Sequence, residues 1–121
     1  MLYKSDSFEV AFIKDNIAEF KFCADGSVNK LSQQTLQDCA LALKELATNS
    51  DIKGMGFTSD KDHFIIGADI FEFLPTFTKP QEELVAWIKN ATDVFDAIED
   101  LPFPTLSAVN GMALGGGCEW A

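Results

Sequence analysis

The chain has 121 residues, 47% of them hydrophobic and 23% charged, which is the composition of one soluble globular domain over residues 1–121. Nine basic residues stand against 19 acidic ones, and the net charge of −10 argues against a nucleic-acid partner. The scattered Cys23, Cys39 and Cys118 and the single His63 predict neither a metal site nor a disulfide framework. The N-terminus lacks the apolar core of a signal peptide, and no apolar run is long enough to span a bilayer. We therefore expect a cytoplasmic protein without a transmembrane segment.

The first third of the chain predicts a β-hairpin followed by a helix. Apolar and polar residues alternate over 8–13 and 17–22, and the intervening Asp15-Asn16 tolerates positive φ. After a loop at 25–27, Ser32 is a typical N-cap for a helix over about 32–47. The residues expected to form its apolar face follow at helical spacing: Leu36, Ala40, Leu43 and Ala47.

The rest of the chain predicts strands around a second helix. We expect a short strand over 52–58, a polar loop over 59–63, a short apolar run over 64–66 and a further loop. Pro80 and the acidic pair after it indicate the start of a helix, whose apolar stripe is expected to pack in the core rather than line a ligand pocket. That stripe consists of Leu84, Trp87, Ile88, Ala91, Val94, Phe95 and Ile98. A buried strand is predicted over 105–109.

The order β-β-α-β-loop-α-β predicts an α/β architecture with crossover connections. The chain stops at Ala121, inside what should be the first turn of another helix. Domains usually end in polar or flexible segments, so we expect a piece of a longer protein.

The run Leu114-Gly115-Gly116-Gly117-Cys118-Glu119 carries the strongest chemical signal. Successive glycines after a strand permit unusual backbone conformations and a close approach of ligand. They lead into a helix start with unpaired N–H groups, the donors that an oxyanion hole needs, and Glu119 could act beside them as a general acid or base. The structural alternative is a tight turn in which Glu119 merely complements the helix dipole.

Dinucleotide and nucleotide loops fit this run poorly. A G-x-G-x-x-G pattern would place its third glycine at Trp120, and no Gly-Lys-Ser/Thr follows.

The second candidate segment is 62–69, where an apolar run stops at Gly67-Ala68-Asp69 and again frees backbone N–H groups. Asp69 could simply cap a helix there, and His63, without an evident partner, is more typical of a surface histidine than of a catalytic base.

Together the segments 64–70, 104–111 and 113–119 resemble the crotonase (enoyl-CoA hydratase/isomerase) superfamily, and the resemblance extends over essentially the whole chain. The opening residues 1–4, the loop 26–31 and Leu101-Pro102 look most like one branch, the α-subunits of bacterial fatty-acid oxidation complexes. The resemblance implies the N-terminal portion of a crotonase-like ββα spiral fold. It also implies an acyl-CoA thioester as substrate, no cofactor, and a thiolase β subunit as partner in a hetero-oligomeric complex.

The resemblance also implies roles for particular residues. The N–H groups of Ala68 and Gly116 would bind the thioester oxygen, and Glu119 would be one of two catalytic glutamates in the hydration of 2-trans-enoyl-CoA. Contacts with substrate and CoA are implied for Ser27, Val28, Lys30, Gly67, Asp69 and Gly115. No metal is implied.

The family's second glutamate would lie beyond Ala121, so we expect this chain alone to be inactive and, with sheet surface uncovered, to self-associate. The alternatives are another crotonase-family acyl-CoA reaction and a non-catalytic CoA-binding or assembly domain.

Overall fold

The computed structural model describes the backbone of residues 1–121 and all side chains except those of Ile70 and Phe73. Five strands form one mixed sheet in sequence order: β1 (Tyr3–Lys4), β2 (Phe8–Lys14), β3 (Ile17–Phe22), β4 (Gly54–Ser59) and β5 (Thr105–Ser107). β1, β2 and β3 pair antiparallel, whereas β3–β4 and β4–β5 are parallel. The helices are α1 (Gln33–Leu46), α2 (Ile70–Thr76), α3 (Gln81–Glu99) and α4 (Gly116–Trp120).

The predicted hairpin is confirmed. Asp15 and Asn16 connect β2 and β3 with φ values of 50° and 65°, the left-handed region that such a turn requires. The Ser32 N-cap is confirmed as well, because its side chain accepts a hydrogen bond from the Thr35 N–H.

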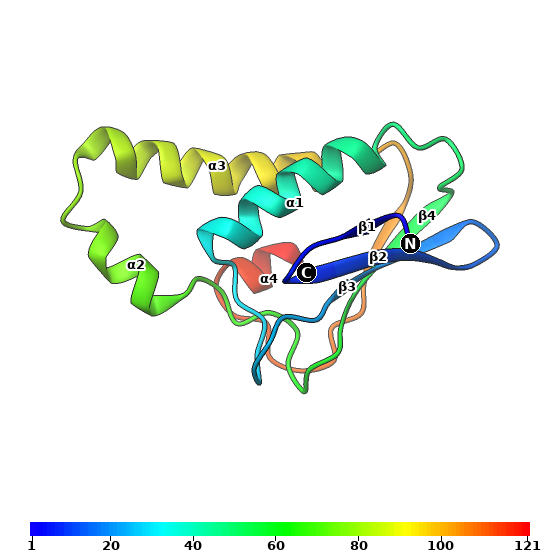
Figure 1. The fold of residues 1–121 in the computed structure, drawn as a ribbon, viewed down its shortest axis with the longest axis horizontal. Coiled ribbons are helices and arrows are strands. Elements are labelled where there is room, and N and C mark those ends of the chain that lie inside the picture. Colours follow the sequence, from blue (N-terminus) through cyan, green and yellow to red (C-terminus); the bar gives the residue numbers. More distant parts are fainter.

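One face of the sheet carries the core. Phe8, Phe20, Phe22 and Phe57 are at most 1% exposed and their rings pack together, with the centroids of the stacked Phe8 and Phe20 rings 4.4 Å apart. Figure 1 shows α1 and α3 together on one side of the sheet, while α2 stands away from the strands. Trp120 brings α4 into this core, because its ring meets Phe22 edge-on at 5.0 Å.

Two predictions about helices need correction. The loop expected after residue 69 contains α2, which is too short and too interrupted by Pro75 to show a helical period. In α1 the expected face is shifted: Ala40 and Ala47 are exposed, and Cys39, Ala42 and Leu46 are buried beside Leu36 and Leu43.

The buried strand predicted over 105–109 is also wrong. β5 spans only Thr105–Ser107, lies at the sheet edge and pairs Leu106 with Gly56 on the face that no helix covers, so Leu106 is 72% exposed. The predicted stripe of α3 is only partly in the core. Val94 is buried, whereas Ile88 is 58% exposed.

Candidate active site

The glycine run forms a tight turn into α4. Gly115 has φ 53° and ψ −124°, a conformation that an L-residue rarely adopts, and Gly116 begins the helix. A Cβ on Gly117 would overlap the carbonyl oxygen of Ile65. Ile65 in turn accepts a hydrogen bond from the Leu114 N–H at 3.0 Å. The turn is therefore docked directly on the apolar run 64–66.

The second segment meets the same turn. Gly67 has φ 94°, and a Cβ there would lie 3.0 Å from the carbonyl oxygen of Leu114. Asp69 caps α2 by accepting the Phe71 N–H at 3.0 Å, which confirms the capping alternative raised for this residue. Ala68 thus lies between a closely packed glycine and the N-cap of α2.

Two backbone donors at this junction are unused. Among the described residues, the N–H groups of Ala68 and Gly116 have no acceptor, whereas those of Gly117 and Glu119 donate to Leu114 and Gly115. Both residues are partly buried and line one pocket, so their open donors are available to a ligand there.

Ala68, Gly116 and Glu119 line one pocket of about 190 Å³. The remaining lining residues are apolar and come from the loop before α1, from α1 and from α3: Leu31, Leu36, Trp87, Ala91 and Phe95. Glu119 is the one ionisable side chain among these, and it has no hydrogen-bond or ion-pair partner in the described part of the chain. We call this hollow the reaction pocket.

The apolar lining was not predicted, because the stripe of α3 was interpreted as core. Its members Trp87, Ala91 and Phe95 are spaced by four residues and so share one helix face. A Cβ on Gly116 would lie 2.8 Å from the Leu31 side chain and 3.6 Å from that of Phe95. Glycine at this position therefore leaves room for the Leu31 and Phe95 side chains.

A second, more polar hollow of about 450 Å³ adjoins the reaction pocket. Its lining includes Ser27, Val28, Lys30 and Asp69. The Leu31 N–H donates to the Gly67 carbonyl at 2.8 Å, which holds the segments around residues 30–31 and 67–69 side by side. Lys30 and Asp69 line the polar hollow, and their neighbours Leu31 and Ala68 line the reaction pocket.

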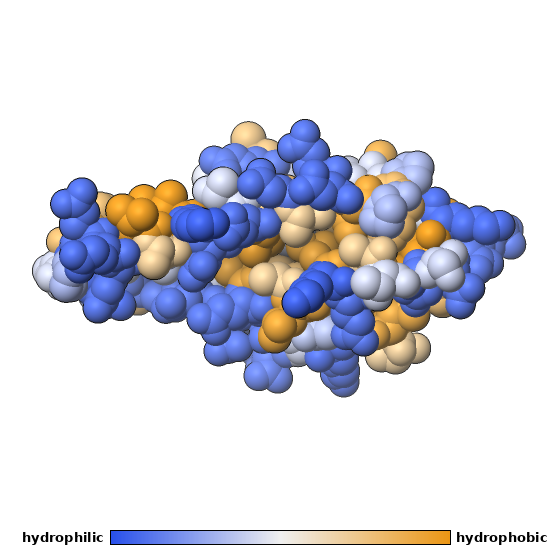
Figure 2. All heavy atoms as spheres, turned by 90° about the horizontal axis from the view of Figure 1, so that it is seen from above, coloured by the Kyte–Doolittle hydropathy of each residue, from blue (hydrophilic) through white to orange (hydrophobic). Residues whose placement is uncertain are grey.

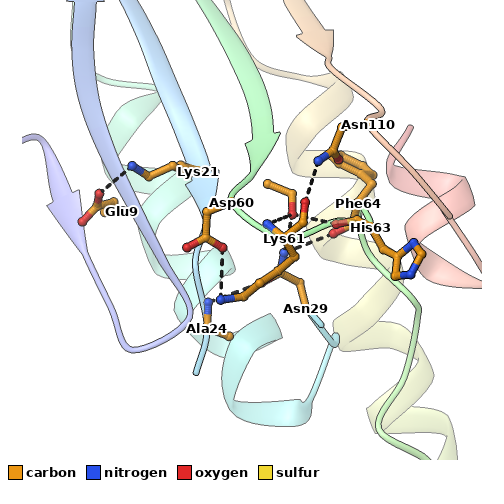
Figure 3. A network of polar contacts seen from close by, with 10 residues as sticks. Glu9, Lys21, Ala24, Asn29, Asp60, Lys61, His63, Phe64 and Asn110 are labelled. Carbon is orange, nitrogen blue, oxygen red and sulfur yellow. Dashed lines mark hydrogen bonds and ion pairs between the residues drawn. The ribbon is translucent and has the colours of Figure 1, made fainter. Parts of the chain in front are cut away.

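Asn29 ties these segments together and was not singled out by the sequence. It is 2% exposed, and its side chain accepts the Ala24 N–H and donates to Ser59 Oγ and the Phe64 carbonyl (Figure 3). Its own carbonyl accepts the Ile66 N–H at 3.0 Å. The Asn29 network therefore joins the loop after β3 to the segment that carries Ala68.

His63 lies outside the reaction pocket. Its Nδ1 accepts the Met112 N–H at 3.3 Å, and Figure 3 shows its ring turned away from Asn29. The structure thus supplies a partner that the sequence did not reveal, and the partner gives the ring a structural contact. Among the described residues no cluster of His, Cys, Asp and Glu could hold a metal ion, and no helix is long and apolar enough to cross a membrane.

The model of the enoyl-CoA hydratase/isomerase family matches residues 13–121, and the chain belongs to that family. The chain is also 47% identical, over 98% of its length, to the fatty acid oxidation complex subunit alpha of Colwellia psychrerythraea. The resemblance drawn from the sequence is confirmed. The chain covers 16% of that relative.

Solved structures agree on the fold. The enoyl-CoA hydratase of Bacillus anthracis superposes with a TM-score of 0.84 at 23% identity, over 94% of this chain and 43% of that one. The enoyl-CoA hydratase of Mycobacterium smegmatis gives 0.85 at 22% identity, over 96% and 44%. The predicted crotonase-like α/β fold is thereby confirmed, and this chain spans less than half the length of these two enzymes.

Proposed function

We propose that this chain carries the oxyanion hole and one catalytic carboxylate of an enoyl-CoA hydratase/isomerase that acts in fatty-acid β-oxidation. The observation that carries the proposal is the meeting of two open N–H groups, those of Ala68 and Gly116, with the carboxylate of Glu119 in one pocket. The two linings support it, because sequence neighbours line the two hollows, so that a CoA moiety in the polar hollow could place its thioester in the reaction pocket across residues 30–31 and 68–69.

The chemistry follows from charge. Adding water across the double bond of a 2-enoyl thioester builds negative charge on the carbonyl oxygen. Two N–H donors fixed at that oxygen stabilise the enolate-like transition state, at about 3–4 kcal/mol for each donor in comparable sites. Glu119 orients the water and takes its proton, a contribution of roughly a hundredfold or more.

Glu119 is the one ionisable side chain that lines the reaction pocket in the described part of the chain. Hydration uses one carboxylate to take a proton from water and an acid to deliver one to the substrate carbon. We therefore propose that this chain by itself turns over little or no crotonyl-CoA, and that a second acid is supplied from elsewhere in the enzyme. We further propose a cytoplasmic location and, by likeness to the oxidation-complex relative, assembly with a thiolase subunit.

The test is infrared difference spectroscopy of butanoyl-CoA labelled with ¹³C at the thioester carbon. This saturated thioester cannot be hydrated, so binding is observed without turnover. We expect the carbonyl stretch to fall below its value in water, because two fixed donors polarise the bond more than mobile water does. A Glu119→Gln variant should keep this shift, since the carboxylate acts on water and not on the carbonyl.

An unshifted carbonyl in a bound ligand would refute the oxyanion hole. A shifted carbonyl, combined with an unchanged hydratase kcat when Glu119→Gln is made in the full-length enzyme, would remove the catalytic role of Glu119 and leave this chain only the binding of the thioester. Robust hydration of crotonyl-CoA by the unchanged chain would contradict the need for a second acid.

A further inference from the structure

The helix α4 is too short and too rich in glycine to hold its own shape. It consists of five residues, Gly116–Trp120, and begins with two glycines. Isolated helices of this length are unstable in water, and glycine is one of the least favourable residues inside a helix. Contacts with the rest of the fold must therefore hold α4 in place, and with it the open N–H of Gly116 and the carboxylate of Glu119.

Trp120 is the side chain through which α4 contacts the core. It is 4% exposed, and its ring meets those of Phe22 and Phe57 edge-on, at centroid distances of 5.0 and 5.4 Å. The Phe20 ring lies at 6.1 Å. Phe20 and Phe22 belong to β3 and Phe57 belongs to β4, so the Trp120 ring connects the glycine turn to two strands of the sheet.

The Trp120 ring also contacts the lining of the reaction pocket. Phe95 of α3 meets it edge-on at 5.9 Å, and Phe95 lines that pocket. Figure 2 shows the outer side of α1 and α3, where apolar surface is visible between hydrophilic side chains, whereas Phe95 packs against the core. A Cβ on Gly116 would lie 3.6 Å from Cζ of Phe95. Trp120 therefore contacts both the strand rings and the ring that lies closest to the open donor on α3.

The indole N–H of Trp120 contributes no hydrogen bond within the part of the chain that the structure describes, where Nε1 is buried and has no acceptor. A buried N–H without an acceptor costs free energy, which a phenylalanine or leucine at this position would avoid. The indole therefore acts on α4 through the size and packing of its ring. The Ser107 hydroxyl donates to the main-chain carbonyl of Trp120 at 3.3 Å, and this contact does not depend on the side chain.

Resting on the proposed function, we infer that Trp120 is a positioning residue for the thioester site, whose ring holds α4 so that the Gly116 N–H stays within reach of the thioester oxygen. The Ala68 N–H is held by other contacts, because the preceding Gly67 carbonyl accepts the Leu31 N–H at 2.8 Å. A smaller side chain at position 120 should therefore displace one of the two proposed donors and leave the other in place.

The experiment is infrared difference spectroscopy of this chain saturated with butanoyl-CoA that is labelled with ¹³C at the thioester carbon. We expect Trp120→Leu to lose about half of the carbonyl shift, because one of the two donors is displaced. Trp120→Phe should give an intermediate shift, since its smaller ring fills part of the space between the strands and Phe95. Neither variant removes a hydrogen bond of Nε1, so the change in shift reports the packing of the ring.

Phe8→Leu is the matched control, because it removes a ring of the same core at a position that is 0% exposed. In the described structure the Phe8 ring contacts Tyr3, Phe20 and Phe22 and not Trp120. The control should lower stability toward urea, as the loss of a core ring does, and leave the carbonyl shift unchanged. A purely structural role of Trp120 would lower stability in the same way without changing the shift.

The full carbonyl shift in Trp120→Leu would overturn the inference, as would a loss of shift in Phe8→Leu that equals the loss in Trp120→Leu. If Trp120→Leu does not fold, Trp120→Phe decides the question, and a shift equal to that of the unchanged chain overturns the inference. An unshifted carbonyl in the unchanged chain refutes the proposed function and the inference with it. A shift that is equal in all variants removes only the present inference.

Discussion

The Asn29 network offers the sharpest test of what holds the candidate site together. In Asn29→Ala, the Ala24 N–H loses its acceptor at 3.3 Å and the Phe64 carbonyl loses a donor at 3.1 Å. Ser59 is less affected, because its hydroxyl still donates to the His63 carbonyl at 2.7 Å. An orphaned buried polar group costs about 1–3 kcal/mol, so we expect the variant to lose about 2–4 kcal/mol of unfolding free energy.

Urea unfolding followed by circular dichroism measures this loss, with Asn90→Ala as the control on an exposed asparagine. The control should change stability by no more than about 0.5 kcal/mol. If Asn29→Ala loses no more unfolding free energy than the control, the reasoning is refuted, because the hydrogen bonds of Asn29 would then not stabilise the fold.

Asn29→Asp adds a pH dependence to the same test. The substituted carboxylate keeps the acceptor for Ala24 but faces the Phe64 carbonyl in a buried site, which should raise its pKa in the folded state above the unfolded value. The destabilisation should then be complete well above the raised pKa and shrink as the pH falls through it. A difference in unfolding free energy between Asn29→Asp and Asn29→Ala that stays the same at every pH would contradict this account.

Three further predictions follow from packing and exposure. Gly116→Val should cost about 1–3 kcal/mol of stability by thermal unfolding and should weaken acyl-CoA binding in calorimetry, because even a Cβ would lie 2.8 Å from the Leu31 side chain. Burial raises the pKa of the Cys39 thiol far above its ordinary value, so with a disulfide reagent at mildly alkaline pH Cys39 should react only after unfolding, while the exposed Cys118 reacts in the folded chain. Leu106→Lys should shift sedimentation of the concentrated chain toward the monomer, because Leu106 is 72% exposed on the uncovered sheet face.

Local features of the fold could be predicted from the sequence because each depends on a few neighbouring residues. The Asp15-Asn16 turn needs only two residues that tolerate positive φ, and Ser32 caps α1 through the N–H three residues on. Asp69 is similar, since the possibility that it caps a helix was recognised even though α2 itself was not. Its helix was missed because Pro75 and the short length hide the period.

Features that depend on distant partners could not be predicted in the same way. An apolar strand is predicted to be buried. Whether Leu106 is covered, however, depends on which other elements pack against the sheet. The stripe Trp87, Ala91 and Phe95 is equally consistent with core and pocket, and only the nearness of Gly116 and Glu119 decides for the pocket. Asn29 gave no signal because its partners lie up to 37 residues away.

The meeting of the candidate site's segments follows from the parallel order of three adjacent strands. β3, β4 and β5 run in the same direction, so the loops that leave their carboxyl ends emerge at one edge of the sheet. The loop after β3 lines the polar hollow through Ser27 and Lys30, the segment after β4 carries Ala68, and the turn after β5 carries Gly116. Backbone donors from such loops need no cationic side chain, which would suit a chain of net charge −10 and the anionic acyl-CoA that we propose as its ligand. Strand order and loop composition together therefore account for the meeting of two open N–H groups that lie 48 positions apart, at residues 68 and 116.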